Sequence, residues 1–140
     1  MHALVDDALA HRHPWTVRTV EGVVVGWTSF MDVNLHDERL ELGSTSYGRP
    51  FWRTAINTET KLLLLSEAFD SRGYERVQFK ADNLNNVSLT AIERLGAKKE
   101  GVMRNHFVRR DGSRRDTVIY SIIRSEWPEV ANSLRLKLNQ

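Results

Sequence analysis

A short polar loop that runs directly into a helix is the part of this sequence best suited to bind an anion. The loop comprises residues 52–57, and apolar positions recurring at i, i+3 and i+7 predict an amphipathic helix over residues 58–72. The first N–H groups of a helix have no acceptor within the helix, and the helix dipole is positive at this end. Loop and helix N–H groups together favour a phosphate site. The alternative is an ordinary helix cap, in which Asn57 or Thr58 accepts a hydrogen bond from a free N–H group.

The elements that must position this loop predict a mixed sheet with flanking helices. Alternating apolar residues predict strands over residues 15–20, 23–30, 39–46, 76–81, 97–108 and 115–124. The pairs Glu21-Gly22 and Asp111-Gly112 predict tight turns, so that two antiparallel hairpins form. The order strand, helix, strand around the loop predicts a right-handed crossover and a local parallel pair.

Further helical patterns lie at both ends of the chain and between the fourth and fifth strands. A short apolar stripe near the N-terminus ends at His11, His13 and Pro14, and a helix that carries Val87 to Leu95 ends at Gly96. A terminal helix covers residues 125–138. We therefore expect one α/β domain of the α+β kind over residues 1–140, with a mixed, mostly antiparallel central sheet flanked by helices.

Composition is that of an ordinary folded domain. The chain has 140 residues, 41% hydrophobic and 27% charged, which is enough for one domain with a real core. It contains no cysteine, which excludes disulfides, thiolate metal sites and cysteine nucleophiles, and its net charge of +2 does not demand a nucleic-acid partner. No apolar run reaches the ~20 residues of a membrane span, and the first residues lack the apolar core of a signal peptide. We expect a cytoplasmic protein without a membrane segment or a metal.

Two runs of the sequence resemble the GCN5-related N-acetyltransferases (GNAT family), and more closely the ribosomal-protein N-terminal acetyltransferases (the RimJ/RimL-like branch). The runs are LELGSTSYGRPFWRTAINTETKLLLLSEAF and RVQFKADNLNNVSLTAIERLGAKKEGVMR. Their most telling marks are Glu41-Leu42-Gly43, Trp52 with Asn57-Thr58-Glu59, Asn85-x-x-Ser88, and Leu95-Gly96-Ala97 before Glu100-Gly101. The resemblance covers roughly residues 15–128.

The resemblance implies a binding site for acetyl-coenzyme A (acetyl-CoA), the co-substrate of this family. The loop 52–57 would hold the pyrophosphate, and the strand near residues 41–44 would splay from residues 76–81 to receive the pantetheine arm. Asn85 would hydrogen-bond the arm, and Ser88 would lie near the thioester sulfur. The cofactor-binding residues implied in this way are Leu42, Gly43, Ser44, Trp52, Arg53, Thr54, Ala55, Ile56, Asn57, Thr58, Asn85 and Ser88.

The implied reaction is acyl transfer from the thioester to an amine, which needs a group that removes a proton from the amine. Ser88 is the candidate proton donor to the departing thiolate, and its alternative role is local bonding in the first turn of the next helix. Candidates for the base are His106, whose ordinary pKa suits the task, and Glu41, which points away from the face that Leu40 and Leu42 bury. His106 is one residue from the position of the acidic base in relatives, and a one-residue slip on a strand reverses the face. A water relay without a dedicated base is a further alternative.

Two departures from the family pattern stand out. Arg53 and Ala55 occupy loop positions where relatives carry glycine, and a non-glycine residue in the left-handed conformation costs ~1–2 kcal/mol. Pairing of Arg53 with phosphate would offset part of this cost. Only residues 1–13 precede the first hairpin, whereas family domains begin with a strand and two helices. The sequence thus predicts an N-terminally shortened domain with an exposed apolar surface, and hence a homodimer.

We expect an acetyl-CoA-dependent N-acetyltransferase that acts on a primary amine, with a protein N-terminus, a small amine and an amino sugar all open as acceptors. One alternative is a non-catalytic acyl-CoA-binding or interaction protein that keeps the GNAT fold. Another is a nucleic-acid binder that uses the arginines at 104, 109, 110, 114 and 115. These arginines flank a hairpin tip without an aromatic ladder, which favours a solvated strand edge over a nucleic-acid surface.

Overall fold

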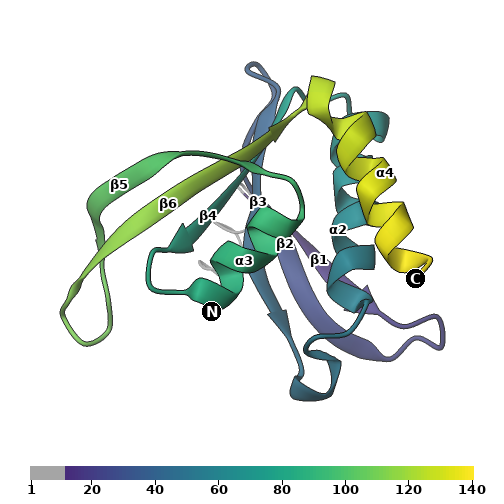
Figure 1. Ribbon diagram of the computed structural model, residues 1–140, viewed down its shortest axis with the longest axis horizontal. Helices are drawn as coiled ribbons and strands as arrows, with labels where there is room; N and C mark the ends of the chain where they lie inside the picture. The colour runs from purple at the N-terminus through teal and green to yellow at the C-terminus, as the bar shows by residue number, and fades with distance from the viewer. Residues whose placement is uncertain (1–11) are drawn as a thin grey trace.

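A six-stranded mixed sheet forms the centre of the computed structural model, which describes residues 12–140 (Figure 1). The strands lie side by side in the order β1-β2-β3-β4-β6-β5. Their bounds are β1 (Arg12–Arg18), β2 (Val24–Asn34), β3 (Arg39–Tyr47), β4 (Arg76–Asp82), β5 (Lys98–Val108) and β6 (Arg114–Ile123). The β3–β4 pair is parallel and the other neighbours are antiparallel, so the predicted fold class is confirmed.

Within residues 12–140, three α-helices and three short helical turns lie between or after the strands. The α-helices are α2 (Ile56–Ser66), α3 (Asn86–Arg94) and α4 (Trp127–Leu138). The turns are η1 (Arg49–Phe51), η2 (Glu67–Ser71), which has π-helical bonding, and η3 (Arg124–Glu126). Together α2 and η2 account for the helix predicted after the loop, although it begins two residues earlier than expected. No helix within residues 12–140 is long and apolar enough to cross a membrane.

The first strand differs from its prediction. His13 and Pro14 were expected to end an N-terminal helix, but both lie inside β1, where Pro14 is opposite Ser29 of β2. Proline is tolerated there because β1 is at the edge of the sheet, where one side of the strand needs no ladder hydrogen bonds. The apolar stripe predicted before His11 lies outside the described residues.

One face of the sheet carries the hydrophobic core. Val77 and Phe79 of β4 lie opposite Ile122 and Tyr120 of β6, and all four are buried in one cluster with side chains of α2, α3 and α4. Because side chains alternate along a strand, the three helices cover the same face. Figure 1 shows α2 and α4 side by side, with α3 crossing the sheet nearer to β4.

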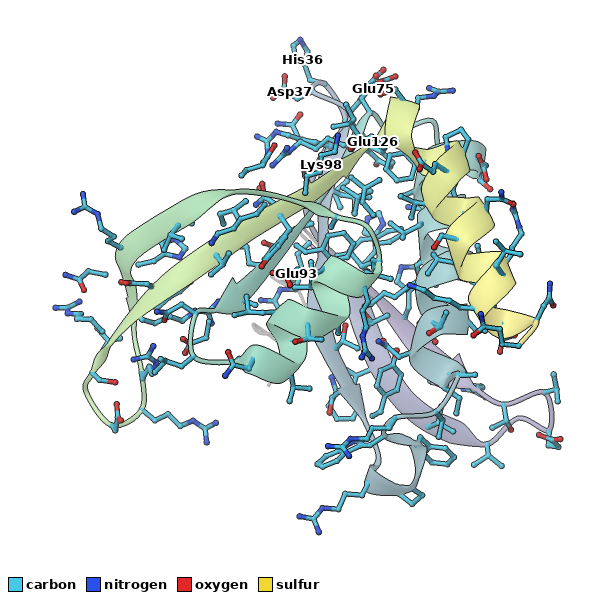
Figure 2. The ribbon with its side chains drawn as sticks, in the orientation of Figure 1. His36, Asp37, Glu75, Glu93, Lys98 and Glu126 are labelled. Atoms are coloured by element: carbon cyan, nitrogen blue, oxygen red, sulfur yellow. The ribbon has the colours of Figure 1, made fainter. Side chains whose placement is uncertain are left out.

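Polar contacts tie the helices to this sheet. The Tyr120 hydroxyl donates to Oε1 of Glu93 on α3 at 2.7 Å, and burial together with this bond raises the pKa of Tyr120 to about 12. Nζ of Lys98, at the start of β5, lies 2.6 Å from Oε2 of Glu126, just before α4. The Glu93, Lys98 and Glu126 side chains are labelled in Figure 2.

Strands β3 and β4 separate soon after they meet. Their pairing is limited to Arg39 with Arg76, Leu40 with Val77 and Glu41 with Gln78. Beyond Glu41, β3 continues to Tyr47 paired only with β2 on its other side. Within residues 12–140, the edge of β3 that faces β4 therefore has no strand partner over its second half, as the resemblance to the family implied.

A β-bulge in the unpaired half of β3 changes which side chains face the helices. The β2–β3 register shifts by one residue between Gly43 and Ser46, and Ser44 has a φ of 52°, in the left-handed region. Leu42 before the bulge is buried in the core, whereas after it Thr45 and Tyr47 turn toward α2. A bulge of this kind re-aims side chains without ending the strand. Here it brings polar groups to the helix-covered face beside the split.

Candidate functional site

A cavity of about 660 Å³ opens where β3 and β4 diverge. Its walls come from the unpaired half of β3, the loop before α2, the first turns of α2, β4 and α3. The lining residues are Leu42, Gly43, Ser44, Thr45, Ser46, Tyr47, Phe51, Trp52, Arg53, Asn57, Lys61, Phe79, Lys80, Val87, Ser88, Ala91 and Ile92. The cavity thus joins an unpaired strand edge to the N-terminus of a helix.

The structure brings only some of the expected cofactor-binding residues to this cavity. Those that line it are Leu42, Gly43, Ser44, Trp52, Arg53, Asn57 and Ser88. Those that do not are Thr54, Ala55, Ile56, Thr58 and Asn85. The loop residues in the second group are expected to bind through their backbone N–H groups, so the direction of their side chains does not decide this role.

The loop has one strained residue, not two. Arg53 has a φ of 59°, in the left-handed region, whereas Ala55 has a φ of −65° and is right-handed. Arg53 therefore bears the ~1–2 kcal/mol that a side chain costs in this conformation, and Ala55 does not. Within the part of the chain that the structure describes, the backbone N–H groups of Arg53, Thr54 and Ala55 donate to no protein acceptor. They are free to bind an anion.

The helix cap expected from the sequence is wrong. Helix α2 begins at Ile56, so Asn57 and Thr58 lie in its first turn and cannot cap it. The Asn57 side chain instead accepts a hydrogen bond from the Tyr47 hydroxyl at 3.0 Å and so ties α2 to β3. Thr54 Oγ1 is the acceptor for the Ile56 N–H at 3.4 Å. The N–H groups of Asn57 and Thr58 have no acceptor inside the helix and remain available.

A buried lysine in the cavity was not predicted from the sequence. Lys61 is only 7% exposed, and its Nζ donates to Thr45 Oγ1 at 3.2 Å. Thr45 Oγ1 lies 2.8 Å from Oγ1 of Thr28, a fully buried residue of β2. Burial lowers the pKa of Lys61 to about 8. The available signal was position: Lys61 lies on the apolar stripe of α2, four residues before Leu65.

Ser88 and Asn85 have different surroundings. The Asn85 side chain caps α3 by accepting a hydrogen bond from the Ser88 N–H at 3.1 Å. Ser88 lines the cavity, and among the described residues its hydroxyl has no hydrogen-bond partner. The first turn of α3 is thus satisfied by Asn85, and the Ser88 hydroxyl is not used for local bonding.

Glu41 lies at the closed end of the split, on the face opposite the helices. Leu40 and Leu42 are buried in the core, so Glu41 points the other way, as predicted. Its Oε1 lies 3.3 Å from Nζ of Lys80, and the Glu41 side chain is 12% exposed. Glu41 does not line the cavity itself, but Lys80 does. The Glu41 carboxylate therefore contacts the cavity wall through its ion pair with Lys80.

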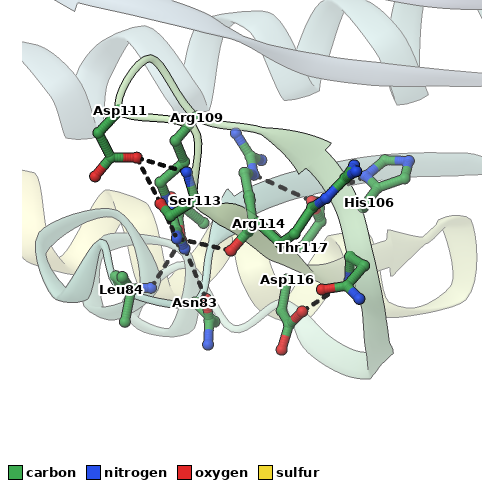
Figure 3. Close-up of polar contacts among 12 residues, drawn as sticks. Asn83, Leu84, His106, Arg109, Asp111, Ser113, Arg114, Asp116 and Thr117 are labelled. Atoms are coloured by element: carbon green, nitrogen blue, oxygen red, sulfur yellow. Dashed lines mark hydrogen bonds and ion pairs between the residues drawn. The ribbon is translucent and has the colours of Figure 1, made fainter.

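His106 is further from the split. It lies on β5, which is separated from β4 by β6, and it does not line the cavity. Its Nδ1 is 2.9 Å from Thr117 Oγ1, a contact that Figure 3 shows. The β5–β6 register is irregular between Met103 and Phe107, and Asn105 has a φ of 51°. This irregularity explains why simple alternation could not assign the face of His106.

The hairpin arginines are partly engaged within the protein. Arg109 forms two hydrogen bonds of 2.7 Å to the Asp82 carboxylate. It also donates to the Arg114 carbonyl (Figure 3). The bond from Arg109 holds the pKa of Asp82 well below its ordinary value. Arg115 donates to Thr117 and lies over the Phe107 ring at 5.2 Å. Both arginines therefore have structural partners. No group of three histidine or acidic side chains within residues 12–140 could hold a metal ion.

A mixed sheet that splits between two parallel strands, with a free helix N-terminus at the split, matches the fold of GNAT acetyltransferases. Residues 2–98 match the family described as Acetyltransferase (GNAT) domain, and the chain belongs to this family.

Several relatives support this assignment. The chain is 30% identical to a GCN5-related N-acetyltransferase from Brucella melitensis, with a TM-score of 0.87, over 96% of this chain and 62% of that one. A crystal structure from T. thermophilus that is assigned to the acetyltransferases is 39% identical, with a TM-score of 0.85, over 97% and 72% of the two chains. The uncharacterised N-acetyltransferase p20 of Bacillus licheniformis is 25% identical over 104 residues, which are 74% of this chain. The chain spans 57% of the length of that curated relative.

Proposed function

We propose that this domain is an acetyl-CoA-dependent N-acetyltransferase that moves an acetyl group to a primary amine. The observation that carries the proposal is the cavity at the β3–β4 split, because one continuous space joins an unpaired strand edge to free N–H groups at a helix N-terminus. Acetyl-CoA has the matching parts, a diphosphate at one end and an amide-bearing arm at the other. The diphosphate would therefore bind the free N–H groups at one end of the cavity, and the arm would pair with the strand edge at the other.

Binding would divide between the two walls of the cavity. The N–H groups of Arg53, Thr54 and Ala55, with those of the first turn of α2, would hold the diphosphate. The edge of β3 at residues 42–44 would pair with the amides of the arm, since it has no strand partner there. The side-chain Oδ1 of Asn85 accepts the capping hydrogen bond of α3. Any hydrogen bond from the Asn85 side chain to the arm would therefore come from its NH₂ group.

Proton transfer is the chemistry that the protein must supply, while bound acetyl-CoA supplies an activated thioester. We assign Ser88 as the proton donor to the leaving sulfur, because its free hydroxyl lines the cavity. We assign Glu41, acting directly or through water, as the base that accepts the proton of the amine. Its link to the cavity through Lys80 favours it over His106, which lies two strands away from β4.

The acceptor is a primary amine, and we propose a protein N-terminus first, in line with the resemblance to the ribosomal-protein branch. The cavity belongs to the helix-covered face, whereas Glu41 lies on the opposite face of the sheet. An acceptor that approaches Glu41 would therefore reach the split from the side away from the helices. That side of β4 presents the partly exposed polar residues Gln78 and Lys80, which suits a polar chain end.

The test combines binding with turnover. Saturating acetyl-CoA should raise the free energy of unfolding by ~2.7 kcal/mol at a hundredfold excess over Kd. Thiol release should then be measured with peptide N-termini, small amines and amino sugars, for the wild type, Ser88→Ala and Glu41→Gln, with the exposed Glu129→Gln as the matched control. We expect release with one acceptor class and losses of about 10²–10⁴-fold in the Glu41 variant.

Each outcome separates the alternatives. A melting temperature unchanged by millimolar acetyl-CoA would refute the proposal as a whole. A clear shift without thiol release from any acceptor would support a non-catalytic acyl-CoA-binding protein instead. A His106→Gln variant that loses activity while Glu41→Gln retains it would reverse the assignment of the base.

A further inference from the structure

Lys61 is a buried cation that has no counter-ion among residues 12–140. Its side chain is only 7% exposed, and its one hydrogen bond goes to a neutral hydroxyl, Thr45 Oγ1 at 3.2 Å. No carboxylate within residues 12–140 lies within 4.0 Å of Nζ. A buried ammonium group is costly unless it is paired. The hydroxyl contact leaves the charge of Lys61 uncompensated.

Among residues 12–140, the charged side chains that line the cavity are all cationic. They are Arg53 from the loop, Lys61 from α2 and Lys80 from β4, and no aspartate or glutamate is among the lining residues. Lys80 is neutralised by Glu41, but neither Arg53 nor Lys61 forms an ion pair among the described residues. The chain as a whole is nearly balanced, with 20 basic and 18 acidic residues. The cavity is therefore selectively positive.

The position of Lys61 directs this charge toward the loop. Asn57 and Lys61 are four residues apart and both line the cavity, so they share one face of α2, about 6 Å apart along the helix axis. Side chains on a helix lean toward its N-terminus. The Lys61 ammonium group and the free N–H groups of the first turn thus face the same space.

We propose that Lys61 binds a phosphate group of the ligand in this cavity and provides the counter-charge that backbone N–H groups alone do not. This goes beyond the phosphate-binding loop, because Lys61 lies more than a turn inside α2. It rests on the proposed function in that the phosphate is assigned to the diphosphate of acetyl-CoA. A free phosphate compound would satisfy the same chemistry, and the experiment distinguishes the two.

The variant Lys61→Met removes the charge and keeps the length of the side chain. Calorimetry should compare wild type and variant with CoA, dephospho-CoA, inorganic pyrophosphate and phosphate-free pantetheine. We expect Lys61→Met to bind CoA and dephospho-CoA at least about tenfold more weakly, the lower end for a bond between charged groups. Pantetheine binding should not change. The control Lys99→Met makes the same chemical change at an exposed residue that forms no ion pair within residues 12–140, and it should leave all affinities unchanged.

Thermal melting of the ligand-free protein separates a binding role from a structural one. If Lys61 is an uncompensated charge held for a ligand, Lys61→Met should raise the melting temperature by about 2–4 °C, since the cost of the buried charge disappears. If Lys61 instead stabilises the fold through its hydrogen bond to Thr45, the variant should melt at a lower temperature. Weaker CoA binding together with a higher melting temperature is the expected signature.

Proton uptake gives an independent readout. Burial places the pKa of Lys61 near 8, and a nearby phosphate would raise it. The other titratable groups that line the cavity are Tyr47 from β3, Arg53 and Lys80, with Glu41 behind Lys80. Dephospho-CoA binding at pH 8, measured in buffers of different ionisation enthalpy, should take up protons in the wild type and none in Lys61→Met.

The outcomes distinguish this proposal from the proposed function. Equal CoA affinity in wild type and Lys61→Met would overturn the role of Lys61 and leave the acetyl-CoA site standing. Pyrophosphate binding that depends on Lys61, without any CoA binding, would support the phosphate contact and overturn the acetyl-CoA assignment. Binding of neither ligand to the wild type would overturn both.

Discussion

Replacing Arg53 by alanine and by glycine separates the cost of its backbone from the use of its side chain. Arg53 is left-handed, with a φ of 59°, and its guanidinium forms no hydrogen bond or ion pair with the described residues. Arg53→Ala keeps the strained backbone, so the free energy of unfolding should stay within ~0.5 kcal/mol of the wild type. Arg53→Gly relieves ~1–2 kcal/mol of strain and adds ~0.5–1 kcal/mol of unfolded-state entropy. The glycine variant should thus be more stable than the wild type by roughly 0.5–1 kcal/mol.

The affinity for acetyl-CoA should fall in both variants, although neither variant is expected to be much less stable than the wild type. If the guanidinium pairs with the diphosphate, both variants should bind acetyl-CoA more weakly by ~1.5–3 kcal/mol and pantetheine equally well. Urea denaturation and calorimetry measure the two effects. Ala55→Gly is the matched control, because Ala55 is already right-handed and glycine there should only destabilise the helix start. A glycine variant less stable than the alanine variant would refute the strain, and unchanged acetyl-CoA affinity in both would refute the phosphate contact.

Other predictions follow from single features of the structure. The pKa of Lys61 is lowered from 10.5 to about 8 by burial, so the unfolded state binds more protons between these values. Wild-type stability should consequently rise with pH across that range relative to Lys61→Met in urea titrations, and parallel curves would contradict the buried charge. The pKa of Asp82 is held low by Arg109, so stability from this pair should be lost as the pH falls below the ordinary aspartate range, and Arg109→Gln should flatten the acid limb of the melting profile. Asn85→Ala should destabilise the fold by ~0.5–2 kcal/mol through loss of the α3 cap, as denaturation would show. Exposed apolar side chains within residues 20–27 favour self-association, so sedimentation at tens of micromolar should show a dimer, and a monomer alone would argue against it.

The main lines of the fold could be predicted because local signals agreed with the global arrangement. Glu21-Gly22 and Asp111-Gly112 mark the turns of the two hairpins, and Gly22 and Gly112 have φ values of 89° and 87° that suit glycine. The parallel β3–β4 pair follows from the strand, helix, strand order. Figure 1 shows the β5–β6 hairpin extending well beyond the rest of the sheet, which its long alternating strands already implied.

The site was harder to predict because it depends on departures from regular patterns. The bulge at Ser44 leaves no mark in the alternation of Leu40 and Leu42, so the direction of Thr45 could not be known. The burial of Lys61 is not predicted by the sequence pattern, because apolar residues alone define the buried stripe of α2. Helix α2 begins two residues earlier than expected. Asn57 therefore lies in its first turn and bonds to Tyr47 of β3 instead of capping the helix.

The bulge in β3 also divides the strand into two parts that can vary separately. Before it, Leu40 and Leu42 belong to the core, and after it Thr45 contacts Lys61 on α2. If Ser44 were an ordinary strand residue instead of a bulge, Ser44 and Ser46 would face the helices and Thr45 would turn to the opposite face, while Leu40 and Leu42 would stay where they are. Natural or designed change could therefore remake the ligand wall of this domain while conserving its core. A single extra residue makes the two halves of one strand independent units of sequence change.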